Sequence, residues 1–300
     1  MVWLKGSLHT HTSESDGDQT PELVSRWYQE HGYDFLVISD HNHLTVIDEF
    51  EKKKNELNIT LIPGEEVTVH IGGIIPVHLN GIGIKKVVKP IETSDIVSTL
   101  QKNIDGIIDA GGLASINHPN LQWTINHNHI LQTQGAHFIE VYNAVLKSNN
   151  FGGLNHHSTD QIWDEILSTG TRIMGVATDD AHNYHDFSFD KKNPGRGWVI
   201  VQSKTNFINS ILEALSSGNF YSTTGVEITE LCMSKDLIEL QFSDAFQFQY
   251  RTLILGQNGA ILDEIAGNTV RYNPKDTSGY IRTKTFSSAG TIGGTQPLFL

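Results

Sequence analysis

Cysteine is almost absent from this chain, since Cys232 is its single cysteine in 300 residues. An intrachain disulfide and a zinc site built from thiolates are therefore both excluded. The sequence also lacks any apolar run that approaches the roughly 20 residues of a membrane-spanning helix. We therefore expect no membrane association and a reducing, cytoplasmic location, with an export signal already trimmed from the chain as the alternative.

Basic residues are scarce relative to acidic ones. The chain has 21 Lys and Arg against 34 Asp and Glu, a formal net charge of -13, whereas general binding to nucleic acids or acidic membranes needs basic surfaces. Nucleic acid is therefore not expected as a partner, except as a nucleotide or short oligonucleotide substrate. A small phosphate ester stays compatible with this charge, because bound metal ions would reverse the local field. Histidine, by contrast, is abundant, with 15 residues.

Strand, polar loop and helix alternate through roughly the first 220 residues. This alternation predicts a parallel sheet, and so many units favour closure into a barrel. Gly-rich, β-branched residues at 69–84 predict a hairpin-like excursion. We expect strands at 35–39, 59–62, 113–116, 138–142, 172–177 and 197–202, and helices at 20–31, 46–57, 93–110, 159–168 and 206–215.

The pattern changes after Gly225 to short alternating runs separated by turn residues. Asn258-Gly259 is typical of a hairpin turn. We therefore predict an α/β fold of two domains: a barrel at 1–224 and a small antiparallel β domain at 225–300.

Two histidines one residue apart follow the first strand-like run. Side chains two residues apart on a strand point to the same face, so His9 and His11 can aim at one point. Further His and carboxylate residues end later apolar runs, and the carboxyl ends of barrel strands are where chemistry is placed. These donors outnumber the four ligands of a tetrahedral zinc, which favours more than one metal with a bridging carboxylate such as Glu66. Their nitrogen and oxygen atoms suit Zn, Mn or Fe. The residues concerned are His9, His11, His41, Glu66, His118, Asp180 and His182.

The order and spacing of these motifs resemble the polymerase-and-histidinol-phosphatase (PHP) superfamily. The resemblance covers most of residues 1–220 and implies a distorted, TIM-like (β/α)7 barrel with a two- or three-metal centre that hydrolyses phosphoesters. It is carried by His9-Thr-His11, Ser15-Asp16-Gly17, Asp40-His41, Gly64-Glu65-Glu66-Val67, His118-Pro119 and Asp180-Ala181-His182.

The resemblance also implies a ligand for each position. The family's Gly-x-Glu pattern selects Glu66 over Glu65, and Val77-His78-Leu79-Asn80 stands where the family has Gly-His-x-Asn. Because Val77 replaces that glycine and a longer excursion precedes it, His70 competes with His78. Carried over by position, His9, His11, Glu66 and Asp180 would hold the first metal, Asp16, His41 and His182 the second, and Glu66, His78 and His118 the third.

Two phrases, Ile139-Glu140-Val141-Tyr142-Asn143 and Ser217-Gly218-Asn219-Phe220-Tyr221-Ser222, look like one branch of the superfamily. That branch carries a short C-terminal β domain and includes a carbamate-ester hydrolase. The expected function is a metal-dependent phosphoesterase that acts on a small phosphate ester through a metal-activated hydroxide. The alternatives are a carboxylic or carbamic ester hydrolase, and a non-catalytic metal-stabilised scaffold whose β domain binds a sugar or a protein.

Several residues have a functional and an ordinary interpretation. Glu66, Asp180 and His182 are expected to be catalytic as well as ligating. Arg196 precedes a strand and is either a surface arginine or an anion-binding one. We expect Asp40 to orient a ligand and Asp179 to be a loop or capping residue. The remaining loop histidines, His127, His129, His156, His157 and His185, are interpreted as solvated, with the alternative that they line the pocket.

Overall fold

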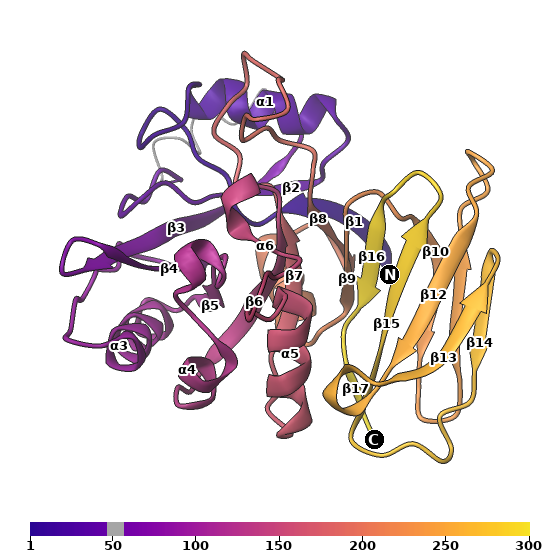
Figure 1. The fold of residues 1–300 in the computed structure, drawn as a ribbon. Helices are drawn as coiled ribbons and strands as arrows, with labels where there is room; N and C mark the ends of the chain where they lie inside the picture. The colour runs from indigo at the N-terminus through magenta and orange to yellow at the C-terminus, as the bar shows by residue number, and fades with distance from the viewer. Residues whose placement is uncertain (47–56) are drawn as a thin grey trace.

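The computed structural model describes residues 1–46 and 57–300. It is an α/β fold in which one 14-stranded mixed sheet runs through the molecule (Figure 1). The helix predicted at 46–57 lies almost wholly outside the described residues. No helix of the described part is long and apolar enough to cross a membrane.

The first half of the sheet contains two sets of parallel strands with one reversed strand between them. β4 pairs antiparallel with both β3 and β5, so the hairpin expected at 69–84 is confirmed. The strands are β1 (Val2–Ser7), β2 (Phe35–Ile38), β3 (Thr60–Ile71), β4 (Ile75–Ile82), β5 (Leu113–Ile116), β6 (Ala136–Asn143) and β7 (Met174–Thr178).

Local sequence explains where the helices begin. Thr20 accepts a hydrogen bond from the Leu23 amide and is followed by Pro21, as predicted for the first helix. Ser158 and Gln161 form a capping box at the start of the helix Thr159–Ser168. α3, α4 and α5 stand in a row beside the sheet (Figure 1) and pack in sequence, α3 against α4 and α4 against α5. The helices are α1 (Pro21–Glu30), α3 (Ile96–Asp109), α4 (His127–Leu131), α5 (Thr159–Ser168) and α6 (Ile208–Ser216).

The expectation of a closed (β/α)7 barrel is wrong. β7 is an edge of the hydrogen-bonded strand order, and in the described residues the segments after β1 and β7 meet through the isolated bridge between Thr10 and Ala181. The partner of β1 on its other side is β8 (Trp198–Ser203), which runs antiparallel to it. Two neighbouring strands can be parallel only if the connection between them crosses over the sheet, usually as a helix. The connection from β7 to β8, residues 179–197, contains no helix in the described chain.

The C-terminal strands extend the same sheet. β9 (Phe220–Thr223) pairs with β8 and with β16 (Ile292–Thr295), and the order continues through β15 (Tyr280–Ser287), β12 (Tyr250–Leu255) and β13 (Ile261–Ala266). β17 (Leu298–Phe299) pairs with β15. β10 (Ile228–Met233), β11 (Ile238–Phe242) and β14 (Thr269–Tyr272) form a separate sheet.

An apolar cluster that includes Val226, Ile238, Phe242 and Ile281 fills this C-terminal part. The turn at Asn258-Gly259 is confirmed: both residues have positive φ, 56° and 70°, and they connect the antiparallel strands β12 and β13. The antiparallel character of the C-terminal part is thus as expected. Since the sheet continues from β9 into β16, the domain boundary near residue 225 stays a prediction.

Candidate metal centre

The segments that follow β1 and β7 are tied together by their backbones. The amide of His11 donates to the carbonyl of Ala181 at 2.9 Å, and the amide of Asp180 donates to the carbonyl of His9 at 3.1 Å. β2 ends just before Asp40 and His41, and an isolated bridge pairs His41 with Glu66 of β3. The carboxyl ends of these strands therefore meet at one mouth of the sheet.

The first group of donors is buried there. The Nε2 atoms of His9 and His11 lie 3.2 Å apart, and each is 3.3 Å from Oδ1 of Asp180. Oε2 of Glu66 lies 3.5 Å from the His9 nitrogen and 3.4 Å from the His11 nitrogen. These four residues are those assigned to the first metal.

A second group surrounds Asp16, which is half exposed. Its Oδ1 lies 3.2 Å from Nε2 of His182, 3.6 Å from Nε2 of His41 and 3.5 Å from Nδ1 of His11. Because His11 faces Asp180 through Nε2 and Asp16 through Nδ1, its ring stands between the first and second groups. The sequence-based assignment placed His11 with the first group alone.

The third group is built on the other oxygen of Glu66. Oε1 lies 3.2 Å from Nδ1 of His78 and 3.2 Å from Nε2 of His118. The carboxylate of Glu66 thus faces the first group with one oxygen and the third with the other, the arrangement expected of a bridging ligand. The neighbouring Glu65 points to the opposite face of β3 and accepts from the amide of Val88 at 2.8 Å.

His70, the alternative to His78, is exposed on β3. Its ring centroid lies 5.2 Å from that of His78, and His70 belongs to none of the three donor groups. The structure therefore brings His78, and not His70, to Glu66.

Divalent metal ions fit this cluster of side chains. Nε2 of His78 is buried and has no hydrogen-bond partner among the described residues, and such orphaned polar atoms are rare in folded proteins. The Nε2 atoms of His9 and His11 can lie this close together only if they share one proton or bind one cation between them. All donors are imidazole nitrogens or carboxylate oxygens, which suits Zn, Mn or Fe.

The charges of the cluster favour cation binding. Burial alone would raise the pKa of Glu66, but His9 and His78 outweigh it and hold its pKa well below the ordinary value. The same holds for Asp180, with His9 as the main opposing group. Burial and the nearby His182 lower the pKa of His11 to about 4. The carboxylates are therefore ionised and His11 is neutral, the states in which they bind metals. Burial alone would lower the pKa of His9, but Asp180 and Glu140 raise it well above the ordinary value, so a cation there would displace a proton.

Two of the candidate ligands have backbones in a sparsely populated conformation. φ is 25° at His118 and 50° at Asp180, a region that costs a non-glycine residue on the order of 1 kcal/mol or more. Both residues lie directly after a parallel strand, β5 or β7. Such strain persists where surrounding contacts hold it, and it is concentrated at functional sites.

A fully buried carboxylate that the sequence reasoning did not single out supports the first group. Oε1 of Glu140, on β6, lies 2.7 Å from Nδ1 of His9, and Oε2 accepts from the amide of His118 at 2.6 Å. Thr178 and Asn143 donate to the same carboxylate. The available signal was a glutamate in the otherwise apolar strand at 138–142, where a charge is buried only if it is paired.

Asn117 is a second supporting residue that was missed. Its amide donates to Oε1 of Glu66 and to the side chain of Asn80, both at 2.9 Å. Asn143 donates to Oδ2 of Asp180 at 3.2 Å as well as to Glu140. Asn117 follows β5 and Asn143 is the last residue of β6. Both resemble ordinary turn residues in sequence, so pattern alone does not separate them from capping residues.

The two aspartates that precede candidate ligands hold loops. Asp40 accepts from the amide and hydroxyl of Thr12 and from Ser15, whose Oγ lies 3.4 Å from Nδ1 of His11. It therefore acts on a candidate ligand through Ser15. Asp179 accepts from the amides of Arg196 and Gly197 and from the hydroxyl of Tyr28, as its interpretation as a loop residue predicts.

The guanidinium of Arg196 is occupied within its own loop. It donates to the carbonyl of Lys191 at 3.1 Å and to Oδ1 of Asn193 at 2.6 Å, with longer contacts to the carbonyls of Ser188 and Phe189. Arg196 therefore shapes the 188–193 loop, and its anion-binding role stays a prediction. His185, in the neighbouring loop, contacts the amide group of Gln19 outside the donor groups.

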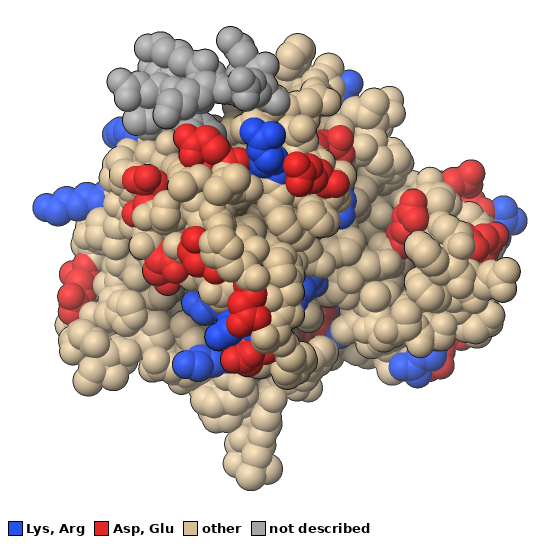
Figure 2. All heavy atoms as spheres, turned by 90° about the horizontal axis from the view of Figure 1, so that it is seen from above, with Lys and Arg blue, Asp and Glu red and all other residues tan. Residues whose placement is uncertain are grey.

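A cavity of about 580 Å³ opens above the donors. Leu121, Val145 and Leu146 form an apolar part of its wall. Lys147, Lys191 and Lys192 also line it, together with Asp190, whose Oδ2 lies 3.8 Å from Nζ of Lys191. Nζ of Lys192 lies 3.2 Å from Nε2 of His182. Elsewhere charge is mixed: on the face drawn in Figure 2, Lys and Arg are interspersed with Asp and Glu.

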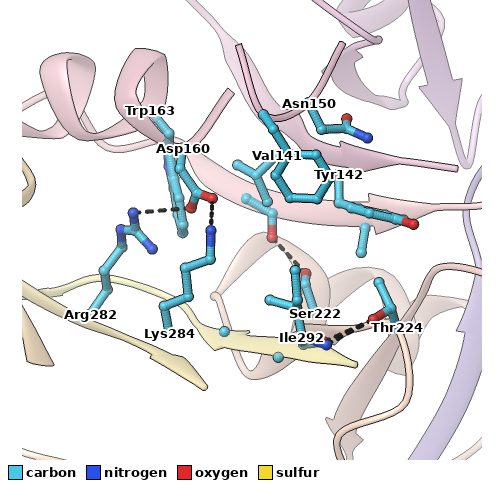
Figure 3. Close-up of a pocket in the computed structure, with 15 residues that line it drawn as sticks. Val141, Tyr142, Asn150, Asp160, Trp163, Ser222, Thr224, Arg282, Lys284 and Ile292 are labelled. Carbon is cyan, nitrogen blue, oxygen red and sulfur yellow. Dashed lines mark hydrogen bonds and ion pairs between the residues drawn. The ribbon is translucent and has the colours of Figure 1, made fainter. Parts of the chain in front are cut away.

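A narrower cavity of about 50 Å³ lies between β6, α5 and the C-terminal strands. Figure 3 shows Asp160 of α5 facing Arg282 and Lys284 of β15 across it. None of the residues that line this cavity belongs to the three donor groups. Its charged side chains connect α5 to the C-terminal strands.

The chain was compared with known proteins. A family model described as "PHP domain" matches residues 7–243. A 5'-3' exoribonuclease from Haemophilus influenzae is 37% identical over 83 residues, which are 27% of this chain and 30% of that protein. An uncharacterized protein from Methanocaldococcus jannaschii is 28% identical over 127 residues, which are 39% of this chain and 68% of that protein.

A solved structure shares the fold across nearly the whole chain. It is a two-domain protein from Bacteroides vulgatus that contains a predicted PHP-like metal-dependent phosphoesterase. It superposes with a TM-score of 0.57 at 18% sequence identity and covers 94% of this chain and 90% of its own. The match with the Haemophilus influenzae protein, by contrast, spans less than a third of that relative's length.

Proposed function

The chain belongs to the PHP domain family, and from that premise we propose that it is a metal-dependent phosphoesterase that acts on small phosphate esters. The observation that carries the proposal is the position of Lys147 and Lys192, beside the ion pair of Lys191 with Asp190, around a cavity whose floor is the cluster of His and carboxylate donors. An anionic substrate accounts for both features. A neutral ester would need the donors but not the lysines.

The proposed ligands follow the three groups of side chains described above. Divalent ions bound there would supply an activated water and positive charge beside the phosphoryl oxygens. Two or three ions are compatible with the donor groups, with Zn, Mn and Fe as the candidate metals. The proposed ligands are His9, His11, Asp16, His41, Glu66, His78, His118, Asp180 and His182.

The protein's own contacts set the state of His182. Its Nδ1 lies 2.8 Å from the carbonyl oxygen of Asp180, and a carbonyl can only accept, so Nδ1 carries the proton. In the neutral ring Nε2 then has a free lone pair, which points toward Asp16 and Lys192. The proposed role of His182 is therefore to bind a cation through Nε2, whose single lone pair faces Lys192 when no cation is bound.

The cavity wall would orient the substrate. The three lysines would hold the phosphate by charge. Each ends in a single, flexible ammonium group and lacks the fixed pair of N–H donors that an arginine would offer. Leu121, Val145 and Leu146 would contact the leaving group and exclude water on that side. Since the volume is about 580 Å³, within the range of small-molecule sites, the proposed substrate is a compact ester.

The test is turnover with a panel of substrates at equal protein concentration. It contains p-nitrophenyl phosphate, bis-p-nitrophenyl phosphate, nucleotides, a short RNA oligonucleotide and aryl esters, each with Mn, Fe or Zn. We expect phosphate monoesters or nucleotides to be hydrolysed and Asp180→Asn to abolish this. Asp236→Asn, an exposed substitution in the C-terminal part, is the control and should match the wild type.

Other outcomes would point to the alternatives. Turnover of aryl esters alone would favour a carboxylic or carbamic ester hydrolase, in which the donors would serve carbonyl chemistry. Turnover of RNA alone would favour a nuclease, the activity named for the Haemophilus influenzae relative. Tight metal binding without turnover of any substrate would favour the scaffold hypothesis.

A further inference from the structure

Two histidines and a glutamate meet outside the cavity, on the row of helices beside the sheet. His127 is the first residue of α4, His157 precedes the N-cap of α5, and Glu165 lies on α5. We propose that these three side chains form a second, peripheral binding site for a divalent transition-metal ion. None of them lines the 580 Å³ cavity or belongs to the donor groups around Glu66.

The donor atoms converge on a single carboxylate. Nδ1 of His127 lies 2.6 Å from Oε2 of Glu165, and Nδ1 of His157 lies 2.9 Å from Oε1. The two rings are nearly parallel, with an interplanar angle of 14° and centroids 6.1 Å apart. All three donor atoms lie within 4.8 Å of one another. One ion with bonds of about 2.1 Å can reach them after small side-chain rotations.

One oxygen of this cluster has an ion-pair neighbour but no hydrogen bond. Oε2 of Glu165 is buried, and its 2.6 Å contact with Nδ1 of His127 lacks the geometry of a hydrogen bond among the described residues. A cation between the carboxylate and the two imidazoles would satisfy Oε2 and both ring nitrogens together.

The chemistry of the three donors identifies the class of ion. Two imidazoles and one glutamate are a ligand set that zinc uses with water in the fourth position. His157 has a 51% exposed side chain, so an ion and its water can reach the site from solvent. The absence of thiolates and of an oxygen-rich shell favours Zn, Co, Ni or Cu over Ca or Mg.

A metal ion bound by His127, His157 and Glu165 would stabilise one wall of the 580 Å³ cavity. The side chain of Asn120 donates to the carbonyls of Asn149 and His157, at 3.1 and 2.8 Å. The segment just before Asn149 supplies Leu146 and Lys147 to the cavity. An ion held by α4, α5 and His157 would thus stiffen the segment that carries these residues. The binding proposal itself does not depend on the proposed catalytic function.

The experiment counts zinc bound by the full-length protein. Protein stripped with a chelator is dialysed against buffered free Zn²⁺, and its zinc is measured by elemental analysis. The variants are His157→Ala and Glu165→Gln, and the control is His156→Ala. His156 is the neighbour of His157 in the same loop, and its exposed ring stacks on Trp123. We expect His157→Ala and Glu165→Gln each to lose one equivalent and His156→Ala to lose none.

A variant of the central site separates this proposal from the proposed function. Asp180→Asn should lose zinc from the central groups and still lose one further equivalent when combined with His157→Ala. If the central groups bind no metal, the wild type should still hold the equivalent that His157→Ala lacks. Wild-type stoichiometry in both His157→Ala and Glu165→Gln, or an equal loss in His156→Ala, would overturn the proposal. The thermal midpoint of each stripped variant shows that it is folded.

Discussion

Replacement of Glu140 by Gln tests how a buried carboxylate orients the candidate ligands. Glu140 is 0% exposed and receives four contacts: His9 Nδ1 and Thr178 Oγ1 at Oε1, and the His118 amide and Asn143 Nδ2 at Oε2. Gln has one acceptor oxygen where Glu has two. Its NH2 group must therefore face one pair of these partners, so the orientation of His9 or of His118 is lost.

The size of the effect follows from these contacts. Loss of a residue that orients metal ligands costs about 10–100-fold in metal affinity or activity, which corresponds to about 1.4–2.8 kcal/mol. Donors left without an acceptor in the core cost about 1–3 kcal/mol of folding stability. We therefore expect metal-free Glu140→Gln to fold, with lower stability, and to bind the metals 10–100-fold more weakly.

Chelator competition measures the metal affinity, and chemical denaturation of the stripped proteins measures stability. Glu213→Gln is the matched control, because Glu213 is exposed on α6 and pairs with Lys204. It should bind metal like the wild type. If Glu140→Gln also retained wild-type affinity within about twofold while folded, the inference that Glu140 positions His9 and His118 would be refuted.

Further predictions concern catalysis, substrate charge and stability. Asp180→Asn should lower phosphoesterase turnover by about 100-fold or more with an unchanged far-UV spectrum; near-normal rates with metal bound would count against its role. Lys192→Ala should raise KM more than it lowers kcat, and the effect should shrink at high salt; an equal effect at all salt concentrations would argue against a charge contact. Asp160→Asn should destabilise the protein by about 1 kcal/mol at neutral pH. Burial alone would raise the pKa of Asp160, but Arg282 and Lys284 hold it below the ordinary value. Its contribution is therefore complete above about pH 3.9 and is lost as the pH falls through the lower folded pKa. Urea denaturation at decreasing pH should show the variant and the wild type converging, and a constant difference would contradict this.

Much of the local structure was predictable because the relevant signals are local. The hydrophobic run at 113–116 gave β5 its bounds, and the helix predicted at 159–168 coincides with α5. Caps such as Thr20 were recognisable from residue type alone. Strands with mixed or exposed residues were not predicted: β13 is largely exposed, so it lacks the alternation that marks a half-buried strand.

The arrangement of the sheet was less accessible to sequence reasoning. The reversal at β4 was expected from the hairpin pattern at 69–84. Elsewhere the alternation of strands and helices suggested a parallel closed barrel, whereas β8 is antiparallel to both of its neighbours. Strand direction depends on whether the connection crosses over the sheet. The lack of a helix signal at 179–197 was the one local indication that this connection is not a crossover. Continuation of the sheet from β9 into β16 depends on pairing between distant segments, which no local pattern encodes.

The candidate site shows the same division. Histidines and acids at strand ends were visible in sequence, and the structure gathers them in three adjoining groups. The contacts that orient them come from Glu140, Asn117 and Asn143, whose significance depends on what they face. Arg196 was open to two interpretations, a surface arginine or an anion-binding one, and the hydrogen bonds of its guanidinium within its own loop could not be read from the sequence.

The claim on which the account depends is that the mouth of the sheet holds divalent cations. Crystals of the protein grown with Mn²⁺ or Zn²⁺, measured on both sides of the metal's absorption edge, test it directly. We expect anomalous peaks within about 2.0–2.3 Å of donors from the groups around Asp180, Asp16 and Glu66. Full occupancy of the protein by metal elsewhere, with no anomalous peak among these donors, would contradict the account.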